Sequence, residues 1–422
     1  MSGTLRARRL PVAVLATVAC GLALPQGAAA HGLVGRADLP VPQWLFAYAA
    51  TLVLVISFVA LAVLWPSPKL QRDRWRPLGS RLALVLAAPP LEHAAQAVGA
   101  LLLALVVWAG LSGTQDVTYN LTPTFVYVIF WLGLVPASVL LGDVFRALNP
   151  WRAIGRAYGW LIGRVAGGRL IPIRPYPERL GYWPAALTIV CFATLELVAA
   201  GGDSPRNLAI ATLIYSVLTL LAMAVFGVDV WLDRGEGFSV YFNLFARISP
   251  FERRDGRLGL RPPLAGLPRL AARPGLVALL GVMIGTVSFD GATAGALWQE
   301  VVPPLRDAFE SLGLPTRRAF ELTFGLGMAA AIAGAVGFYR LGIAGARSAG
   351  GELGAARLAG AFAHSLVPIA LAYVAAHYLS LLAFQGQAIV FLASDPLGRG
   401  WDLFGTASSG IDYAILSATA IW

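Results

Sequence analysis

Histidine and carboxylate side chains inside long apolar runs are the residues of this sequence most suited to chemistry. His364 and His377 lie in one such run and His93 lies near the start of another. Five acidic residues share these runs or their ends: Glu92, Asp143, Glu196, Asp229 and Glu321. Because a charge in an apolar segment is costly, such residues mark proton relays, ion paths, metal sites or catalytic centres by default.

These side chains fall into two groups at different depths along the apolar runs. The inner group contains Glu92, His93, Asp143, Asp229 and His364, and the outer group contains Glu196, Glu321 and His377, with Asp290 near them at the end of its run. His364 and His377 are thirteen residues apart, or about 20 Å along a helix, so one ion cannot bind both. The catalytic candidates are therefore His377, Glu321 and Glu196 in the outer group, or His93, Glu92 and His364 in the inner group, and the sequence alone does not choose between them.

A divalent metal is one cofactor that these residue types suit, because imidazole and carboxylate are common ligands of zinc and related ions. The candidate ligands are His93, His364, Asp143 and Asp229 in the inner group, or His377 and Glu321 in the outer group. No motif such as HExxH supports either set. Pairing of the carboxylates with arginine, histidine or backbone groups is the competing interpretation.

The elements that position these groups follow from composition. Hydrophobic residues make up 58% of the 422 residues and charged residues 13%, with a mean hydropathy of +0.70, so lipid must surround most of the chain. Runs of about 18 or more apolar residues predict membrane helices. The fold class is therefore all-α, a polytopic transmembrane helical bundle with about eight spans: 43–65, 89–112, 123–145, 181–200, 207–232, 274–292, 319–340 and 358–385.

The arginine distribution orients these spans. Residues 1–30 combine a basic start, a short apolar stretch and Ala28-Ala29-Ala30, which predicts a cleaved signal peptide and an external mature amino terminus. Residues 31–422 then form a single membrane domain in the bacterial cytoplasmic membrane. Twenty-three of the 32 basic residues fall in the predicted cytoplasmic loops, near 66–88, 146–180, 233–273 and 341–357. Topology thus explains the net charge of +10, and no nucleic-acid partner is implied.

Two of these loops have recognisable patterns. From Trp151 to Leu170, arginines alternate with large apolar residues, which predicts a basic amphipathic helix on the inner leaflet, whereas the prolines of 262–274 predict an extended linker. The segments FRALNPW (145–151) and FARISPF (245–251) lie one hundred residues apart and form a weak internal repeat, as transporters often have. Chance similarity explains seven residues equally well, so the repeat is supporting evidence only.

Several segments resemble a family of multi-pass actinobacterial membrane proteins labelled fenitrothion hydrolase. The resemblance rests on HGLVGRADLPVPQWLF after the signal peptide, GDVFRALNPWRAIGR, HSLVPIALAYVAAHY, and SDPLGRGWDLFG near the end. It implies a membrane-bound activity that cleaves phosphorothioate triesters, with an apolar small-molecule substrate that enters from the lipid bilayer. It assigns no catalytic residues. The family's chain is expected to continue into a further span beyond Trp422.

Two functions follow as hypotheses. The first is hydrolysis of organophosphate esters by water that a metal or a carboxylate–histidine pair activates. The second is a transporter or channel subunit in which the same acids and histidines form a proton or ion path. His364, His377 and the carboxylates serve either hypothesis, so the arrangement of these side chains in space has to discriminate between them.

Overall fold

The structure, a computed structural model, is mostly helical and describes residues 43–64, 70–86, 88–165, 172–348 and 353–416. Within these residues, seven segments are long and apolar enough to cross a membrane: 89–112, 121–141, 178–197, 205–226, 276–293, 316–348 and 355–394. Each of them overlaps one of the predicted spans, as an all-α membrane bundle requires.

The start of the chain leaves the number of spans open. The first predicted span, 43–65, forms helix α2 (Gln43–Leu64). Its apolar part, Tyr48–Leu61, is shorter than the length required of a membrane span, so α2 is not among the seven. The predicted signal peptide, residues 1–30, lies outside the described residues. Eight spans and the signal peptide therefore stay predictions.

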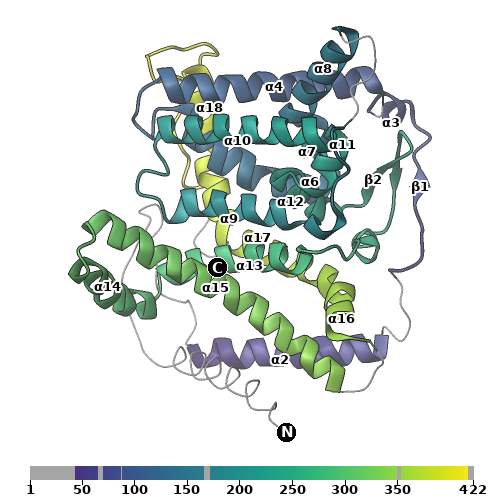
Figure 1. Ribbon diagram of the computed structural model, residues 1–422, viewed down its shortest axis with the longest axis vertical. Coiled ribbons are helices and arrows are strands. Elements are labelled where there is room, and N and C mark those ends of the chain that lie inside the picture. Colours follow the sequence, from purple (N-terminus) through teal and green to yellow (C-terminus); the bar gives the residue numbers. More distant parts are fainter. Residues whose placement is uncertain (1–42, 65–69, 87, 166–171, 349–352, 417–422) are drawn as a thin grey trace.

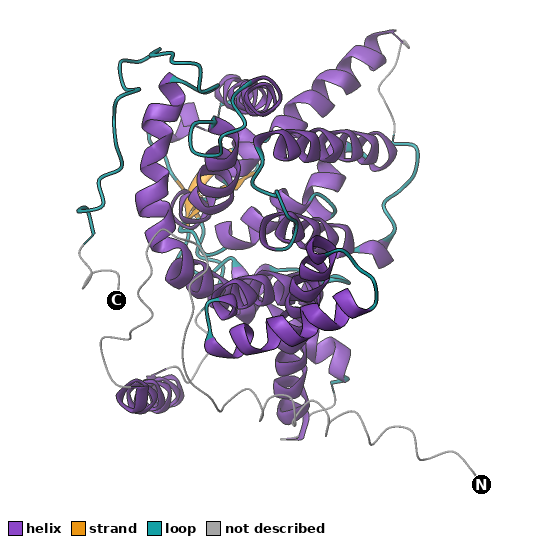
Figure 2. Ribbon diagram, turned by 90° about the vertical axis from the view of Figure 1, so that its left-hand side faces the viewer, coloured by secondary structure: helices purple, strands orange, loops and turns teal. Residues whose placement is uncertain are grey.

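Four long helices run roughly parallel in Figure 1: α4 (Pro89–Ser112), α10 (Pro205–Phe226), α9 (Trp183–Leu197) and α13 (Leu276–Thr293). Proline in the first turn starts α4, α9 and α10, where its missing N–H costs no hydrogen bond. α4 packs against α10, and α9 packs against α13. Figure 2, turned by 90°, shows most of the helices gathered in one bundle.

Helix α13 is the centre of the second half of the bundle. It packs against α15 (Thr316–Ser348) and α17 (Leu366–Gln385) as well as α9. Glycine lets α13 and α15 approach closely, because a Cβ built on Gly285 would lie 2.5 Å from Cα of Ile332. No side chain fits there without moving the backbone of one helix.

The shorter elements connect these helices. Before α9 the chain forms α3 (Arg81–Leu86), α5 (Leu121–Pro123), the π-helix η1 (Thr124–Gly133), α6 (Leu134–Leu141), α7 (Val144–Leu148), α8 (Pro150–Val165) and the 3-10 turn η2 (Glu178–Leu180). After α10 it forms α11 (Val228–Arg234), α12 (Gly237–Ala246), η3 (Leu267–Arg269), α14 (Ala296–Ser311), α16 (Ala355–Phe362), η4 (Ala363–Ser365), η5 (Gly386–Ala388) and α18 (Ile389–Ser394). The amphipathic helix predicted from residue 151 corresponds to α8.

A small sheet lies at the arginine-rich end of the bundle, on the right of Figure 1. The strands β1 (Arg76–Pro77), β3 (Arg257–Leu260) and β2 (Phe251–Arg254) pair antiparallel in that order, with Arg76 opposite Leu260 and Phe251 opposite the same residue. The sheet ties two predicted loops together. Trp75 fixes this contact by donating a hydrogen bond from Nε1 to the carbonyl oxygen of Glu252, at 3.1 Å.

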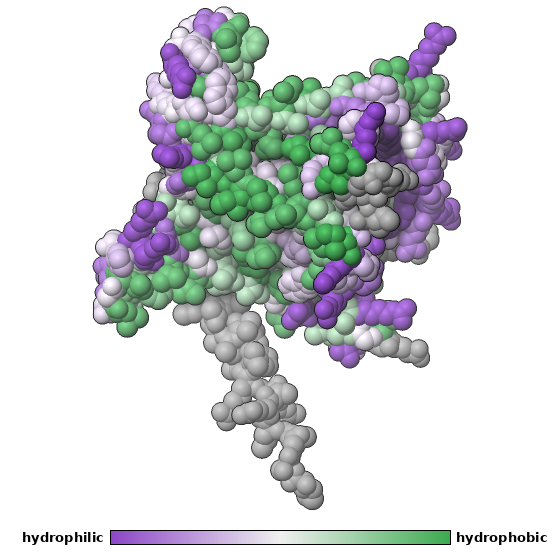
Figure 3. Space-filling view, turned by 45° about the horizontal axis from the view of Figure 1, so that its top comes forward, coloured by the Kyte–Doolittle hydropathy of each residue, from purple (hydrophilic) through white to green (hydrophobic). Residues whose placement is uncertain are grey.

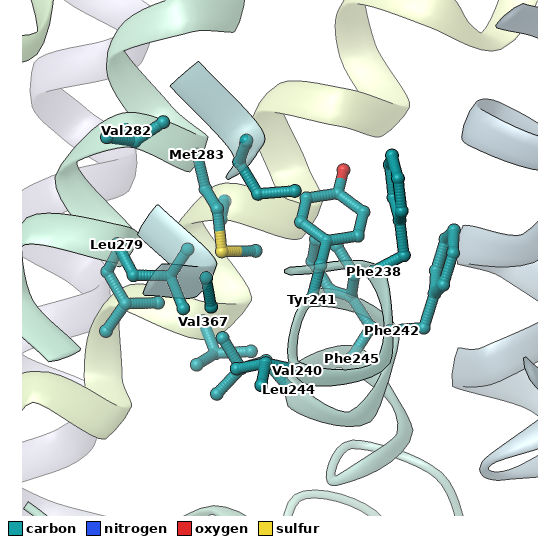
Figure 4. Close-up of a cluster of buried hydrophobic side chains, with 14 of the residues drawn as sticks. Phe238, Val240, Tyr241, Phe242, Leu244, Phe245, Leu279, Val282, Met283 and Val367 are labelled. Carbon is teal, nitrogen blue, oxygen red and sulfur yellow. The ribbon is translucent and has the colours of Figure 1, made fainter. Parts of the chain in front are cut away.

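Helix α12 lies in the core, although the sequence interpretation places residues 233–273 in a cytoplasmic connection. Its residues Phe238, Tyr241, Phe242 and Phe245 are all buried, and Figure 4 shows them gathered beside side chains of α13. Tyr241 stacks on Trp131 of η1 at a centroid distance of 4.4 Å. Ten apolar residues are too short to be recognised as a span, so the length criterion misses this helix.

The outer surface of the bundle is apolar. Leu187 of α9 is 64% exposed and Leu218 of α10 is 60% exposed. Figure 3 shows hydrophobic residues across the middle of one face and hydrophilic residues toward its left and right edges. An apolar band bounded by polar ends is the surface that a bilayer covers, so the long helices belong in a membrane.

Candidate functional site

Asp290 joins two of the membrane helices through its carboxylate. Oδ2 of Asp290, in the last turn of α13, lies 2.9 Å from Nε2 of His377 on α17. The hydroxyl of Tyr378 donates a second hydrogen bond to the same oxygen, at 2.7 Å. Adjacent residues of a helix point about 100° apart, so His377 and Tyr378 approach the carboxylate from two sides. The side chain of Asp290 is 11% exposed and that of His377 35%.

A second carboxyl group stands near this pair. Glu196 of α9 interacts electrostatically with Asp290, Tyr378 and Tyr241. In the described part of the chain, its side chain makes no hydrogen bond or ion pair. We call Glu196, Asp290, His377 and Tyr378 the acid–histidine cluster. It combines two carboxyls near the ends of α9 and α13 with an imidazole and a phenol of α17.

The imidazole of His377 can exchange protons through its remaining nitrogen. When Asp290 is ionised, Nε2 carries the proton donated to Oδ2, and Nδ1 is then the acceptor nitrogen. Nδ1 lies 3.6 Å from the position that a Cβ would take on Gly291, so glycine leaves room for the ring beside α13. An Asp–His pair of this kind can act as a proton relay or as a general base.

Glu321, the third acid predicted for the outer group, lies in a different set of contacts. Its carboxylate pairs with Arg318 at 2.8 Å and with Arg317 at 3.3 Å, and it accepts a hydrogen bond from the amide of Ala200 at 3.2 Å. Arg317 also donates to the carbonyl oxygen of Ala200, at 2.6 Å. Glu321 therefore ties the start of α15 to the connection between α9 and α10.

The inner carboxylates are paired with arginines. Glu92 of α4 contacts Arg253 at 2.7 Å, Arg156 at 3.4 Å and Arg152 at 3.5 Å. Asp229 of α11 contacts Arg152 and Arg156, both at 3.2 Å. Burial lowers the pKa of the Arg152 guanidinium, and the neighbouring charges of Arg146 and Arg156 add to this effect, whereas Asp229 and Glu92 oppose it. These contacts join α4, α8, α11 and β2. Pairing of carboxylates with arginines is the competing interpretation given above for the inner group.

The remaining inner candidates are separate from that network. Asp143 caps α7 by accepting from the amide of Arg146 at 3.1 Å, and it accepts a second hydrogen bond from Asn243 at 2.9 Å. His93 is exposed on α4, and Nδ1 of His364 lies 2.8 Å from the carbonyl oxygen of Ala361. Neither histidine pairs with a carboxylate among residues that the structure describes.

A metal does not fit these groups. In the described ranges, no three histidine, cysteine, aspartate or glutamate side chains come close enough together to bind one ion. Asp290 and His377 would supply two ligands, and a protein site for zinc normally needs three or four.

Sequence reasoning missed two members of the cluster as site residues. From the sequence, Asp290 is expected only near the outer group, and Tyr378 is not among the candidates. The available signals were an acid in the last turn of an apolar run and a tyrosine directly after the candidate histidine. It also missed Glu236, which is 1% exposed, caps α12 by accepting from the amides of Phe238 and Ser239, and accepts a hydrogen bond from Tyr215.

A large apolar cavity of about 450 Å³ lies elsewhere in the bundle, between α4, η1, α9 and α10. Its wall includes Leu187 and Leu218, which also face the outer surface, and its polar lining groups include Tyr215 and Cys191. The cluster residues Asp290, His377 and Glu196 are not in its wall.

Comparison of the chain with protein-family models, with curated proteins and with solved structures finds no match to any of them.

Proposed function

We propose that the protein moves protons across the membrane, with the acid–histidine cluster as its protonation site. The observation that carries this proposal is the sharing of one carboxylate oxygen of Asp290 by His377 and Tyr378, inside helices that are long and apolar enough to span a bilayer. Ionisable groups at such positions cost free energy to bury, so their presence indicates a functional role rather than a contribution to stability.

The geometry supports a stepwise relay. An incoming proton adds to Nδ1 of His377, and the imidazolium that forms is balanced by the carboxylate of Asp290 at 2.9 Å. The proton on Nε2 then passes to Oδ2, which leaves the imidazole neutral. Glu196, the neighbouring acid, is the next acceptor along the bundle.

Proteoliposomes test this function directly. The purified protein should acidify vesicles that contain a pH-sensitive dye when a potassium diffusion potential drives protons inward. Asp290→Asn and His377→Gln should each reduce the flux by roughly a hundredfold or more, since a positioned proton-transfer group contributes about that factor or more. His93→Gln is the matched control, because His93 lies outside the cluster, and it should conduct as the unmodified chain does.

Two results would contradict the proposal. One is a flux in the unmodified protein no greater than that of empty vesicles. The other is an Asp290→Asn variant that is folded, as judged by gel filtration in detergent, and still conducts normally.

A second function, hydrolysis of apolar organophosphate triesters, is favoured by the cavity. A volume of about 450 Å³ with an almost wholly apolar wall suits a small ester that partitions from lipid. In this reaction water adds to phosphorus, the bond to the phenol oxygen breaks, and the phenol leaves with one proton of the water. The catalytic candidates do not line the cavity, so the arrangement supports this function less than proton movement.

Nitrophenol release from fenitrothion tests the second function. Ala211 lines the cavity, so Ala211→Trp should fill it and abolish turnover if the ester binds there. Ala333→Trp on the exposed face of α15 is the matched control. Undiminished turnover in Ala211→Trp, or none in the unmodified protein, would exclude the cavity as a substrate site.

A further inference from the structure

A polar cleft of about 500 Å³ opens at the arginine-rich end of the bundle, away from the acid–histidine cluster. Its wall is formed by α7, the start of α8, α11, α12 and the segment that follows η3. Three aspartates line it, namely Asp143, Asp229 and Asp233. Six arginines also line it: Arg146, Arg152, Arg234, Arg247, Arg269 and Arg273. The cleft therefore has an excess of three positive charges.

Internal ion pairs do not use all of these arginines. Arg152 is held by Asp229 and Glu92, and Arg273 pairs with Asp233 at 3.6 Å. Arg146 and Arg247, in contrast, form no ion pair with any acid in the described residues. Two guanidinium groups are thus available for an anion.

Buried donor groups in the same cleft also lack partners. Arg152 is only 4% exposed, and its Nε–H makes no hydrogen bond to described residues. Nε of Arg247 is buried and unpartnered in the same sense, although one of its terminal nitrogens donates weakly to the carbonyl oxygen of Gly266, at 3.4 Å. Leaving such donors unsatisfied costs free energy, and a bound anion that draws the guanidinium groups around it can recover part of that cost.

Both segments of the weak internal repeat contribute residues to the wall of this cleft. Arg146 and Asn149 belong to FRALNPW, and Arg247 belongs to FARISPF. The hydrogen bond from Asn243 to Asp143, at 2.9 Å, connects the residues that precede the two copies. Each segment contributes one arginine without an acidic partner among the described residues, although Arg146 and Arg247 stand at different positions of the two segments.

We propose that this cleft is a binding site for a phosphate-bearing anion, with Arg146 and Arg247 as its principal contacts. Guanidinium groups bind phosphate oxygens through paired, charge-assisted hydrogen bonds, which lysine cannot reproduce. The same chemistry is offered by a small phosphate compound in solution and by the head group of an anionic phospholipid.

Calorimetric titration and thermal unfolding of the full chain distinguish these two sources. Inorganic pyrophosphate is titrated into the protein in phosphatidylcholine nanodiscs, and unfolding is compared in nanodiscs with and without phosphatidic acid. Saturable pyrophosphate binding assigns the site to a soluble phosphate. Stabilisation by phosphatidic acid without pyrophosphate binding assigns it to a lipid head group.

Paired variants connect the binding to the cleft. Arg146→Gln combined with Arg247→Gln should weaken either response by roughly tenfold or more for each arginine lost, as expected for hydrogen bonds to a charged group. Arg306→Gln combined with Arg318→Gln removes the same charge at α14 and α15 and should leave the response unchanged. Arg247→Lys keeps the charge and the fold but not the paired contacts, so it should bind with intermediate affinity. The proposal is overturned if neither ligand binds the unmodified protein, or if the cleft variant and the control variant lose affinity equally.

Discussion

Asp290 and His377 are 87 residues apart in the sequence, yet Oδ2 of the aspartate and Nε2 of the histidine are 2.9 Å apart. The contact links α13 to α17, the helix pair at the centre of the second half of the bundle. Tyr378 and Glu196 complete the acid–histidine cluster from α17 and α9. The other predicted site residues serve as ion-pair partners, as caps or as surface groups, so this cluster is the part of the molecule best suited to move protons.

Glu92→Gln should destabilise the protein by about 1–3 kcal/mol, because the buried Arg152 loses one of its two carboxylate partners and keeps only Asp229. Chemical unfolding in detergent, followed by tryptophan fluorescence, measures the change. Glu321→Gln is the comparison, since its partners Arg317 and Arg318 are 65% and 70% exposed, and the loss there should be about 1 kcal/mol or less. Equal losses of unfolding free energy in the two variants would show that the ion pairs of Glu92 contribute no more to stability than exposed ion pairs do.

Gly285→Ala should destabilise the contact between α13 and α15 by about 1–3 kcal/mol, the usual cost of overpacking. The added Cβ would meet the backbone of Ile332, which cannot rotate away as a side chain can. Gly334→Ala on α15 meets nothing within 4 Å, so it should be neutral or stabilise the helix by up to about 1 kcal/mol. Thermal unfolding of both variants in the same detergent decides the matter, and an unaffected Gly285→Ala variant would disprove the close approach.

The contact between the loop that contains Asp73 and the β2–β3 hairpin should weaken in acid. The hydrogen bond from Arg254, at 2.7 Å, lowers the pKa of Asp73, and the hydrogen bond from the amide of Trp75 adds to this effect. An acid whose pKa is lower in the folded state stabilises that state above its unfolded pKa, which is about 3.9 for aspartate. That contribution is lost as the pH falls below about 4 and through the folded pKa.

Hydrogen exchange of the amides of 251–260, measured between neutral pH and pH values below that of an ordinary aspartate, tests this dependence. Exchange must first be corrected for its intrinsic pH dependence. Asp73→Asn should already show the weaker protection at neutral pH and little further change in acid. The same pH response in both proteins would locate its origin in another group.

Tyr215→Phe should reduce stability by about 1–3 kcal/mol, because it removes a hydrogen-bond donor from the buried carboxyl of Glu236. Glu236 would keep its bonds to the amides of Phe238 and Ser239 only. Tyr158→Phe, at an exposed position of α8, is the matched control and should change little. Chemical unfolding of the two variants checks this, and equal stability would mean that the tyrosine is not needed there.

The sequence reveals the long helices because apolar length is a local property. The predicted span 89–112 coincides with α4, and 274–292 lies within two residues of α13. It does not reveal α12, whose ten residues are buried by neighbours distant in sequence rather than by lipid. The linker prediction for 262–274 also leaves out the β2–β3 hairpin just before it, although Asp255-Gly256 at the turn, where both residues have positive φ, is a local hairpin signal.

The candidate site was predictable by residue type but not by partner. His377 and Glu196 are candidates because they are ionisable groups in apolar runs, and both are in the cluster. Depth along the chain does not separate Glu321 from them, but the spacing of Arg317 and Arg318 four and three residues before it on the same helix is a local signal for the ion pairs that the fold shows. His93 and His364 are candidates by residue type as well. Only the fold shows that neither of them pairs with a carboxylate among the described residues.

The most direct test of the central claim is the proton flux of Asp290→Asn in proteoliposomes, measured beside the unmodified protein and His93→Gln. If Asp290 and His377 form the protonation site, the unmodified protein and His93→Gln conduct equally, and Asp290→Asn loses roughly a hundredfold or more of the flux. A folded Asp290→Asn protein that conducts as well as the other two would contradict the account.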